Sequence, residues 1–455
     1  MRSRLTIALT GALIVGCGGK AVHVSKPWTP LAGVAAMTAE YRQFIDYGRT
    51  PSRVLDFVEK RSSRFRVVDV HAATGMRARP GDRLLFVDRN RTAVFVVVGK
   101  QPLVTGGAHV LGAHIDTPSP RLAPQPVDET AQTTLKAFRY GGMRTHHWVH
   151  VPLALVGRVA RASGGTVDVE IGLHDDFALY IADTHKGLRV TVSSTPTAER
   201  LDGVPPQTLT ALLHARYGLT PADLQAAELY LVPKHGAREV GIDRQLIGAH
   251  GQDDRVNSYA AWRAVIDVAG TPQVTAITWL VDREEVGSAH AVGGRSRFLE
   301  LVYAWLIRAQ GTRVTEAALD RALARSVALS ADTPAAVNPN WAQVHELKNA
   351  PFLGRGPALF PFTGHGGKGG GSQARAGLVE AVVEAFASAH VPLQFGELGR
   401  VDEGGGGSIA KYLSHRGMDV VDIGVSVVGM HSPMELSAKA DIWSAYRGFR
   451  QWLQQ

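Results

Sequence analysis

The chain has 455 residues, of which 45% are hydrophobic and 20% are charged, a composition typical of a globular protein large enough for more than one domain. Its 49 Lys and Arg residues exceed its 41 Asp and Glu residues, which gives a formal net charge of +8 at pH 7. The basic residues are scattered, without a run of five or more, so the charge does not predict nucleic-acid binding.

The N-terminal segment MRSRLTIALTGALIVGC has the layout of a secretory signal peptide: two arginines, an apolar stretch too short for a comfortable membrane span, and small residues. Its ending, IVGC, resembles a bacterial lipobox, in which the cysteine becomes the lipidated first residue of the mature protein. We therefore predict that residues 1–17 form a lipoprotein signal and that a lipid on Cys17 anchors the exported protein to a membrane of a bacterial cell envelope. A plain signal peptide, or a packed first helix of a cytoplasmic protein, is the alternative. Cys17 is the single cysteine, so no disulfide can form within the chain.

Residues 18–124 are predicted to form the first part of an α/β domain. After a short linker, the amphipathic spacing of SRVLDFVEKR indicates a helix. Strand patterns follow in FRVVDV, RLLFVDR, TAVFVVVG and HVLGAHID. The last two are nearly all apolar, which is typical of strands buried on both faces of a sheet.

Residues 125–242 show a different pattern, with short strand candidates and no long helices between them, and this pattern predicts an inserted β-rich domain. Short strand patterns separated by Gly and Ser occur in LALVGRVARA, TVDVEIGL, FALYIAD and LRVTVSS, before a helical stretch, TLTALLHARYGL, and the strand AELYLVP. Over residues 243–455 helices and strands alternate again, as in NSYAAWRAVIDVAG, VTAITWLVD and MDVVDIGV. This alternation predicts a three-layer α/β sandwich with a mainly parallel sheet, interrupted by the β-rich insertion.

Potential metal ligands stand at the ends of four predicted strands of the α/β part and, in one further segment, just before a predicted helix. The residues are His114 and Asp116 in HVLGAHID, Glu284 and Glu285 after VTAITWLVD, Asp332 in RSVALSAD, His431 after DIGVSVVGM, and Asp253 and Asp254 in GAHGQDDRVNSY. Nitrogen and oxygen donors without thiolate suit zinc, cobalt or manganese at a hydrolytic site. Two ions about 3.5 to 4 Å apart need a bridging carboxylate and roughly two further ligands each. Five of these residues supply that number: His114, Asp253, Glu285, Asp332 and His431.

Taken singly, each residue has a more ordinary interpretation. A histidine after a strand usually packs in the core or lies on the surface, an aspartate there commonly caps a helix or forms a turn, and a glutamate pair is usually solvated. Their shared position at strand ends is what favours a metal site.

The longer phrases around these residues form a recognisable set: GAHIDTPSPRLAP, GQDDRVNSYAAW, VDREEVGSAHAVGGRS, SADTPAAVNPNW, VDEGGGGSIAKYL and GMHSPMELSAKAD. In order and spacing they resemble the motifs of the aspartyl aminopeptidase / aminopeptidase I family of metallopeptidases, from about residue 30 to the C-terminus. The resemblance implies an α/β peptidase fold with a co-catalytic pair of zinc ions and an inserted domain used for dimerisation. It also implies a homo-oligomer, either a dimer or a dodecamer, that acts on peptide substrates.

Carried over by motif, the resemblance assigns roles to the predicted ligands. His114, Glu285, Asp332 and His431 would each bind one ion or the other, and Asp253 would bridge the two ions, with Asp254 as the alternative bridge. Asp116 would orient His114. Glu284 would be the general base that takes a proton from metal-activated water and later delivers it to the leaving amine.

The chain departs from the family's pattern near the expected substrate pocket. Asn338 stands where the family commonly has a histidine, and Phe360 stands where it often has a lysine, so that the nearest lysine is Lys368. His185 matches only loosely a family histidine that reaches a neighbouring active site. These differences concern substrate choice rather than hydrolysis.

The sequence therefore predicts a metalloaminopeptidase that removes the N-terminal residue from peptides. The alternatives are a two-metal deacylase or carboxypeptidase acting on other amides, and an inactive peptidase module kept for binding. The complete ligand set and Glu284 argue against the inactive module.

Overall fold

The computed structural model describes residues 33–72, 75–128, 133–184, 187–193 and 209–455. The predicted signal with Cys17, and also His185, lie outside these described residues. None of the helices that the structure describes is both long and apolar enough to cross a bilayer.

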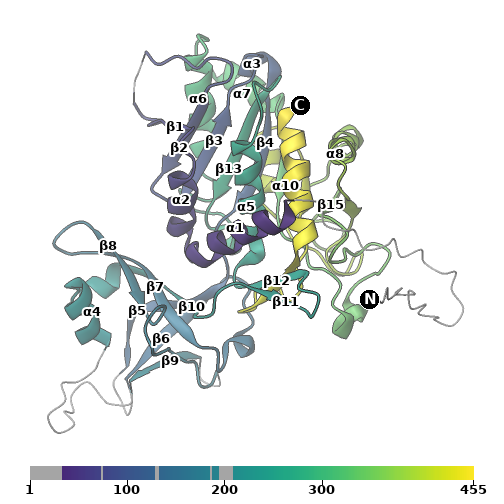
Figure 1. Cartoon of the computed structure of the whole chain (residues 1–455). Coiled ribbons are helices and arrows are strands. Elements are labelled where there is room, and N and C mark those ends of the chain that lie inside the picture. The colour runs from purple at the N-terminus through teal and green to yellow at the C-terminus, as the bar shows by residue number, and fades with distance from the viewer. Residues whose placement is uncertain (1–32, 73–74, 129–132, 185–186, 194–208) are drawn as a thin grey trace, which may run out of the picture.

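A sheet of nine strands forms the middle of the larger domain, in the order β1-β2-β3-β13-β4-β14-β17-β15-β16 (Figure 1). The four inner strands β13, β4, β14 and β17 are parallel neighbours, whereas β3 and β15 pair with them in antiparallel fashion. The strands are β1 (Arg66–Val67), β2 (Arg83–Asp88), β3 (Thr92–Val97), β4 (Ala108–His114), β13 (Thr275–Val281), β14 (Val327–Ala331), β15 (Ala358–Phe360), β16 (Gln394–Phe395) and β17 (Asp419–Gly424).

Helices cover both faces of this sheet because its strands are apolar on both sides. Along β3, Phe95 and Val97 join the core under one helical layer, while Val94 and Val96 join the core under the other. One layer contains α1 (Val34–Tyr47), α2 (Pro51–Lys60), α5 (Gln252–Ile266), α8 (Ala376–Ser388) and α10 (Lys439–Gln454). The other contains α3 (Leu103–Gly106), α6 (Phe298–Ala309), α7 (Glu316–Ala324) and α9 (Ala410–His415).

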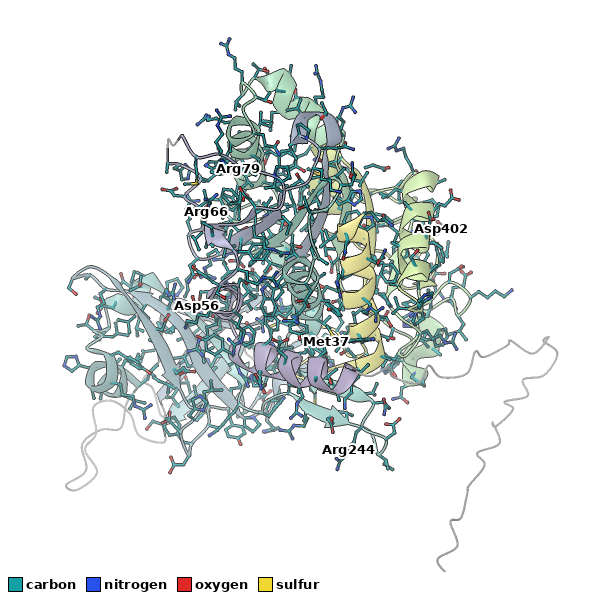
Figure 2. The ribbon with its side chains drawn as sticks, turned by 45° about the horizontal axis from the view of Figure 1, so that its top comes forward. Met37, Asp56, Arg66, Arg79, Arg244 and Asp402 are labelled. Carbon is teal, nitrogen blue, oxygen red and sulfur yellow. The ribbon has the colours of Figure 1, made fainter. Side chains whose placement is uncertain are left out.

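Met37 lies on the buried face of α1, whereas the charged residues Arg79, Arg244 and Asp402 are exposed on connecting segments (Figure 2). The predicted three-layer sandwich with a mainly parallel sheet is confirmed.

A second, six-stranded antiparallel sheet forms a separate lobe, in the order β8-β7-β10-β5-β6-β9 (Figure 1). It runs from Ser119 to Pro233, against the expected limits of 125 and 242, and has its own apolar core around Trp148 and Leu155. Its elements are β5 (Ser119–Asp128), β6 (Thr133–Tyr140), η1 (Thr145–Trp148), β7 (Leu153–Ala160), β8 (Thr166–Ile171), β9 (Leu188–Ser193), α4 (Leu209–Tyr217), η2 (Asp223–Ala226) and β10 (Ala227–Pro233). A small sheet of β11 (Arg238–Val240), β12 (Leu246–Ala249) and β18 (Glu435–Ala438) follows.

One predicted strand does not form as a strand. The segment FALYIAD makes only single bridges, which join Leu179 to Leu153, Tyr180 to Thr191 and Ile181 to Val149. The segment meets three different neighbours and so builds no continuous ladder with any of them.

Candidate active site

The candidate active site lies at the edge of the large sheet where the four inner parallel strands end. His114 is the last residue of β4, Asp332 follows β14 directly, and the two glutamates form η3 (Glu284–Val286) just after β13. His431 lies between β17 and β18. Asp253 stands in the first turn of α5, where its backbone angles are not helical. The carboxyl ends of parallel strands meet at one edge, which is where open α/β sheets bind their ligands.

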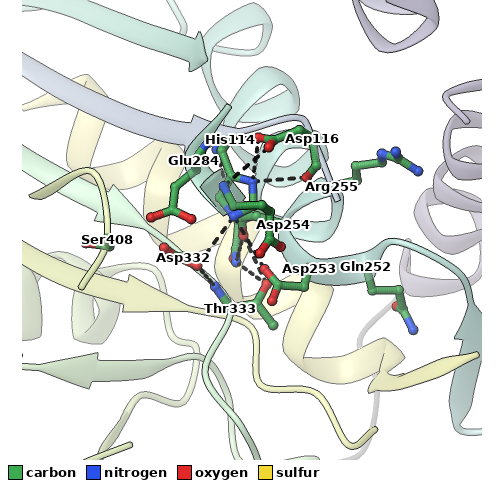
Figure 3. A network of polar contacts seen from close by, with 12 residues as sticks. His114, Asp116, Gln252, Asp253, Asp254, Arg255, Glu284, Asp332, Thr333 and Ser408 are labelled. Carbon is green, nitrogen blue, oxygen red and sulfur yellow. Dashed lines mark hydrogen bonds and ion pairs between the residues drawn. The ribbon is translucent and has the colours of Figure 1, made fainter. Parts of the chain in front are cut away.

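Asp253 presents its two carboxylate oxygens to two different histidines. Its Oδ1 lies 3.4 Å from Nε2 of His114, and Oδ1 of Asp332 lies 3.8 Å from the same nitrogen. Its Oδ2 lies 3.0 Å from Nε2 of His431, and Oε1 of Glu285 lies 3.4 Å from that nitrogen. The five predicted ligands thus form two sets, each with one histidine and one carboxylate, that share Asp253. Figure 3 shows His114, Asp253 and Asp332 converging, while Gln252 points away.

The donor set fits cations. Asp253 Oδ1 and Glu285 Oε1 are buried and accept no hydrogen bond from any residue that the structure describes. Oxygen and nitrogen atoms of His114, Asp253 and Glu285 all lie within 4.8 Å of one another. Buried carboxylate oxygens without a donor are costly unless a cation compensates them. Imidazole nitrogens and carboxylate oxygens are ligands that zinc accepts.

The pKa shifts within the cluster also indicate a site suited to cations. Burial raises the pKa of Glu285 to about 7, and the neighbouring Asp253 adds to the effect. Burial alone would lower the pKa of His431, but the carboxylates of Asp253 and Glu285 beside its Nε2 outweigh it and raise the pKa to about 12. Both shifts reflect negative charge crowded into a buried cluster, which is the charge that bound cations would balance.

Asp254, the alternative bridging ligand, uses both of its carboxylate oxygens in hydrogen bonds within the protein. Its Oδ2 accepts the backbone N–H of His114 at 3.1 Å, and its Oδ1 accepts hydrogen bonds from Asn257 at 2.6 Å and Thr333 at 3.0 Å. Although its oxygens lie near those of Asp253 and Asp332, its hydrogen bonds tie together the segments that carry the ligands. The geometry favours Asp253 as the shared ligand.

Asp116 lies behind His114. The Nδ1 atom of His114 is 3.1 Å from the backbone oxygen of Asp116 and 3.3 Å from its Oδ1. A proton on Nδ1 leaves Nε2 as the nitrogen that faces Asp253. Asp116 Oδ1 also accepts the backbone N–H of Glu284 at 3.0 Å, so one buried carboxylate holds both His114 and the turn that carries Glu284.

Glu284 faces the first set of ligands. Its carboxylate lies within 4.8 Å of donor atoms of both His114 and Asp332. Burial, followed by the charge of Asp332, raises the pKa of Glu284 well above its ordinary value. A carboxylate of raised basicity beside a metal-binding cluster has the properties of a general base.

A cavity of about 250 Å³ opens beside the cluster. Phe360, at the end of β15, contributes to an apolar part of its wall together with Phe362, Leu398 and Met430. The acids Glu397 and Asp422 also line it, and no Lys or Arg among the described residues does so.

The other predicted pocket residues lie differently. Lys368 donates to Glu397 Oε2 at 2.6 Å and stands outside the cavity wall. Asn338 caps η4 (Pro339–Val344), where its side chain accepts the backbone N–H of Asn340 at 3.0 Å. It is absent from the cavity wall as well.

Sequence reasoning did not single out Glu435, although it stands in the quoted motif GMHSPMELSAKAD. Its Oε2 accepts the backbone N–H groups of Gln252 at 2.5 Å and Asp253 at 3.1 Å, and its Oε1 accepts that of His431 at 2.6 Å. It therefore ties the backbones of two predicted ligands together. An acid four residues after His431, within the same motif, was the available signal.

A mainly parallel α/β sandwich with a buried cluster of His, Asp and Glu at the carboxyl ends of its strands defines a metal-dependent hydrolase of the metallopeptidase type. The sequence profile of the aminopeptidase I zinc metalloproteases (M18) matches residues 44–178 and 184–453. A probable M18 family aminopeptidase 1 of Borrelia garinii is 31% identical over 452 residues, which cover 93% of this chain and 98% of the relative.

Solved structures agree with that match. The crystal structure of the M18 aminopeptidase from Thermotoga maritima is 30% identical, covers 95% of this chain and 98% of its own, and superposes with a TM-score of 0.86. The dodecamer of S. cerevisiae mApe1 is 20% identical and covers 91% of this chain and 95% of its own, with a TM-score of 0.76, which shows a common fold.

The chain belongs to the M18 family of aminopeptidases. It is a zinc metalloaminopeptidase, and the alternatives of a deacylase, a carboxypeptidase or an inactive module are not favoured by these relatives.

Proposed function

We propose that this aminopeptidase works with two metal ions that share Asp253. The observation that carries the proposal is the division of the Asp253 carboxylate, with one oxygen toward His114 and Asp332 and the other toward His431 and Glu285. We take zinc as the native metal, with cobalt or manganese as substitutes, because every donor is nitrogen or oxygen.

In this proposal a side chain of the protein, Glu284, carries the proton during hydrolysis. When bound, the ions act as Lewis acids and lower the pKa of a coordinated water molecule. Glu284 accepts a proton from the attacking water and delivers it to the leaving amine. Asp116 holds the Glu284 turn and His114 in register, through the contacts described above.

Metal removal tests the two-ion proposal. A strong chelator should abolish hydrolysis of an aminoacyl chromogenic substrate, and added zinc should restore it. The number of zinc ions per chain, measured by elemental analysis, should be two in the wild type and about one in His431→Ala. A fully active wild type with one ion per chain would contradict the proposal.

For specificity, we propose that neutral or hydrophobic N-terminal residues are cleaved at least as well as aspartate. The cavity wall carries Phe360 and two acids, and Lys368 is already paired with Glu397. A desolvated acidic side chain would need a cation there, because an unpaired buried charge is costly. Values of kcat/KM for Leu, Ala, Asp and Glu substrates test this. A kcat/KM for Asp or Glu substrates more than tenfold above that for Leu and Ala substrates would contradict this proposal.

We further propose that the chain forms a homo-oligomer, a dimer through the inserted sheet or a dodecamer. The S. cerevisiae relative, solved as a dodecamer, supports the larger assembly. Light scattering combined with gel filtration measures the mass. A stable monomer at micromolar concentration would refute the proposal.

For location, we propose an exported, membrane-anchored lipoprotein that carries its lipid on Cys17. The support is the signal-like layout of residues 1–17 and its lipobox-like ending. A cytoplasmic protein that retains these residues is the alternative.

A further inference from the structure

The inserted sheet reaches the candidate metal ligands through one short segment, residues 140–142, at the end of β6. The hydroxyl of Tyr140 donates to Asp116 Oδ2 at 2.6 Å, and both side chains are buried. The same carboxylate stands behind His114 and accepts the backbone N–H of Glu284. A hydroxyl group from the insertion therefore fixes the carboxylate that orients a ligand and the proposed base.

The next residues of this segment lie beside the second histidine. The carbonyl oxygen of Gly142 is 3.3 Å from Nδ1 of His431. If Nδ1 donates its proton there, Nε2 is the nitrogen that faces Asp253, at 3.0 Å. The approach is close, because a Cβ atom at Gly142 would lie 3.0 Å from the His431 Nδ1 and the imidazole ring would have to move to admit it.

Tyr140 is itself held from within the inserted sheet. The guanidinium carbon of Arg121 lies 3.1 Å from the centre of the Tyr140 ring and 4.2 Å from that of Tyr230. Arg121, on β5, is thus placed between the two rings and keeps Tyr140 directed at Asp116. The hydroxyl of Tyr230 accepts a hydrogen bond from Arg91 at 3.1 Å instead.

We propose that residues 140–142 form a positioning segment through which the inserted domain sets the orientation of both histidine ligands. This inference rests on the proposed function of His114 and His431 as metal ligands. It makes the insertion a part of the metal centre, beyond any use of it as a surface between subunits.

Tyr140→Phe tests the first contact. Phenylalanine keeps the ring on Arg121 and removes only the hydrogen bond to Asp116. Loss of such an outer partner typically lowers metal affinity or activity about 10- to 100-fold. We expect about a tenfold lower zinc affinity, measured by competition with a chelator, and a kcat reduced to a similar degree with KM nearly unchanged. Tyr230→Phe is the matched control, since it also removes a hydroxyl from a ring stacked on Arg121.

Gly142→Ala tests the second contact independently, because the added methyl group should displace the His431 ring. We expect weaker binding of one of the two zinc ions. Gly377→Ala is its control, since a Cβ atom there would meet nothing within 4 Å.

Chelator competition reports zinc affinity without any reference to peptide hydrolysis. If wild-type protein fails to bind zinc, the proposed function falls. If wild type binds two ions while Tyr140→Phe and Gly142→Ala bind them as tightly, the positioning role is overturned and the proposed function stands. Equal losses in Tyr140→Phe and Tyr230→Phe would also overturn it. Should Tyr140→Phe fail to fold, as judged by circular dichroism, the Gly142→Ala result decides.

Discussion

Glu284 and Glu285 are adjacent in sequence, yet their carboxylates have different surroundings. Arg283, just before them, adopts a left-handed backbone with φ of 69°, which turns the chain sharply from β13 into η3. Glu285 then lies 3.4 Å from His431, and Glu284 lies near His114 and Asp332. In a strand the two side chains would point to opposite faces. The turn is what would let Glu284 act as the proposed base while Glu285 acts as a proposed ligand.

Replacing Glu284 by Gln should separate these roles. The variant keeps the size of the side chain but cannot accept a proton, so kcat should fall by about 10²- to 10⁴-fold, the range typical for loss of a general base. Zinc content per chain and KM should change little, because Glu285 remains. Glu403→Gln, a change at an exposed loop position, is the control. A variant that retains wild-type turnover would remove Glu284 from the mechanism.

At the residue level, the sequence could predict which side chains belong to the cluster but not how they share it. His114, Asp332 and Glu285 were recognisable because each follows an apolar strand pattern. The choice between Asp253 and Asp254 depends on backbone angles in the first turn of α5. Tyr140 gave no signal, because it stands in a sheet of a different domain and meets Asp116 only after folding.

Among the elements, the parallel strands were the most predictable. Strand β4 and strand β13 are mostly apolar, as is typical of parallel strands buried on both faces, and their ends therefore marked the site. The register that sets Val281 beside His114 could not be read from the sequence, because it depends on pairing between strands far apart in the chain.

Helix α10 carries a buried acid that should affect stability. Asp441, in its first turn, accepts the backbone N–H groups of Gly354 and Gly356, each at 2.7 Å. Burial nevertheless raises the pKa of Asp441 from 3.8 to about 7. The folded chain therefore holds this proton more tightly than the unfolded chain, and stability falls as pH rises from about 4 to about 7. At about 1.4 kcal/mol for each tenfold change in proton affinity, the loss is on the order of 4 kcal/mol.

Asp441→Asn should remove this pH dependence. The amide offers only one acceptor oxygen, so the variant loses one hydrogen bond at every pH, and its melting temperature relative to wild type should be lowest in acid. Between pH 4.5 and pH 8 that difference should shift by several degrees in favour of the variant. Asp402→Asn, at an exposed position, should show no such shift. A constant difference between Asp441→Asn and wild type across this range would contradict the prediction.

In the whole molecule, two sheets of different type serve one site. The candidate ligands gather where the parallel strands of the large sheet end, and the antiparallel sheet is inserted after β4 (Figure 1). Tyr140 and Gly142, at the end of β6, contact the surroundings of these ligands. The sequence indicated both sheets, because the pattern of predicted elements changes from alternating strands and helices to a series of short strands. It could not indicate that the second sheet returns to the first, since none of the motifs lies within β6.

The N-terminal segment with its lipobox-like ending sets where we expect the mature protein to reside. Processing before Cys17 and acylation of that residue should place the mature protein in the membrane fraction, since two or more acyl chains give stable anchoring. Cys17→Ser removes the acceptor thiol, so the variant should leave the membrane or accumulate as an unprocessed, non-lipidated precursor. Fractionation with immunoblotting, together with mass spectrometry of the N-terminus, measures both outcomes. Because Cys17 is the single cysteine, metabolic labelling with a fatty acid should mark the wild type and not the variant. Native protein found wholly in the cytosol with residues 1–16 still attached would refute the anchor and leave the N-terminal segment as part of a cytoplasmic enzyme.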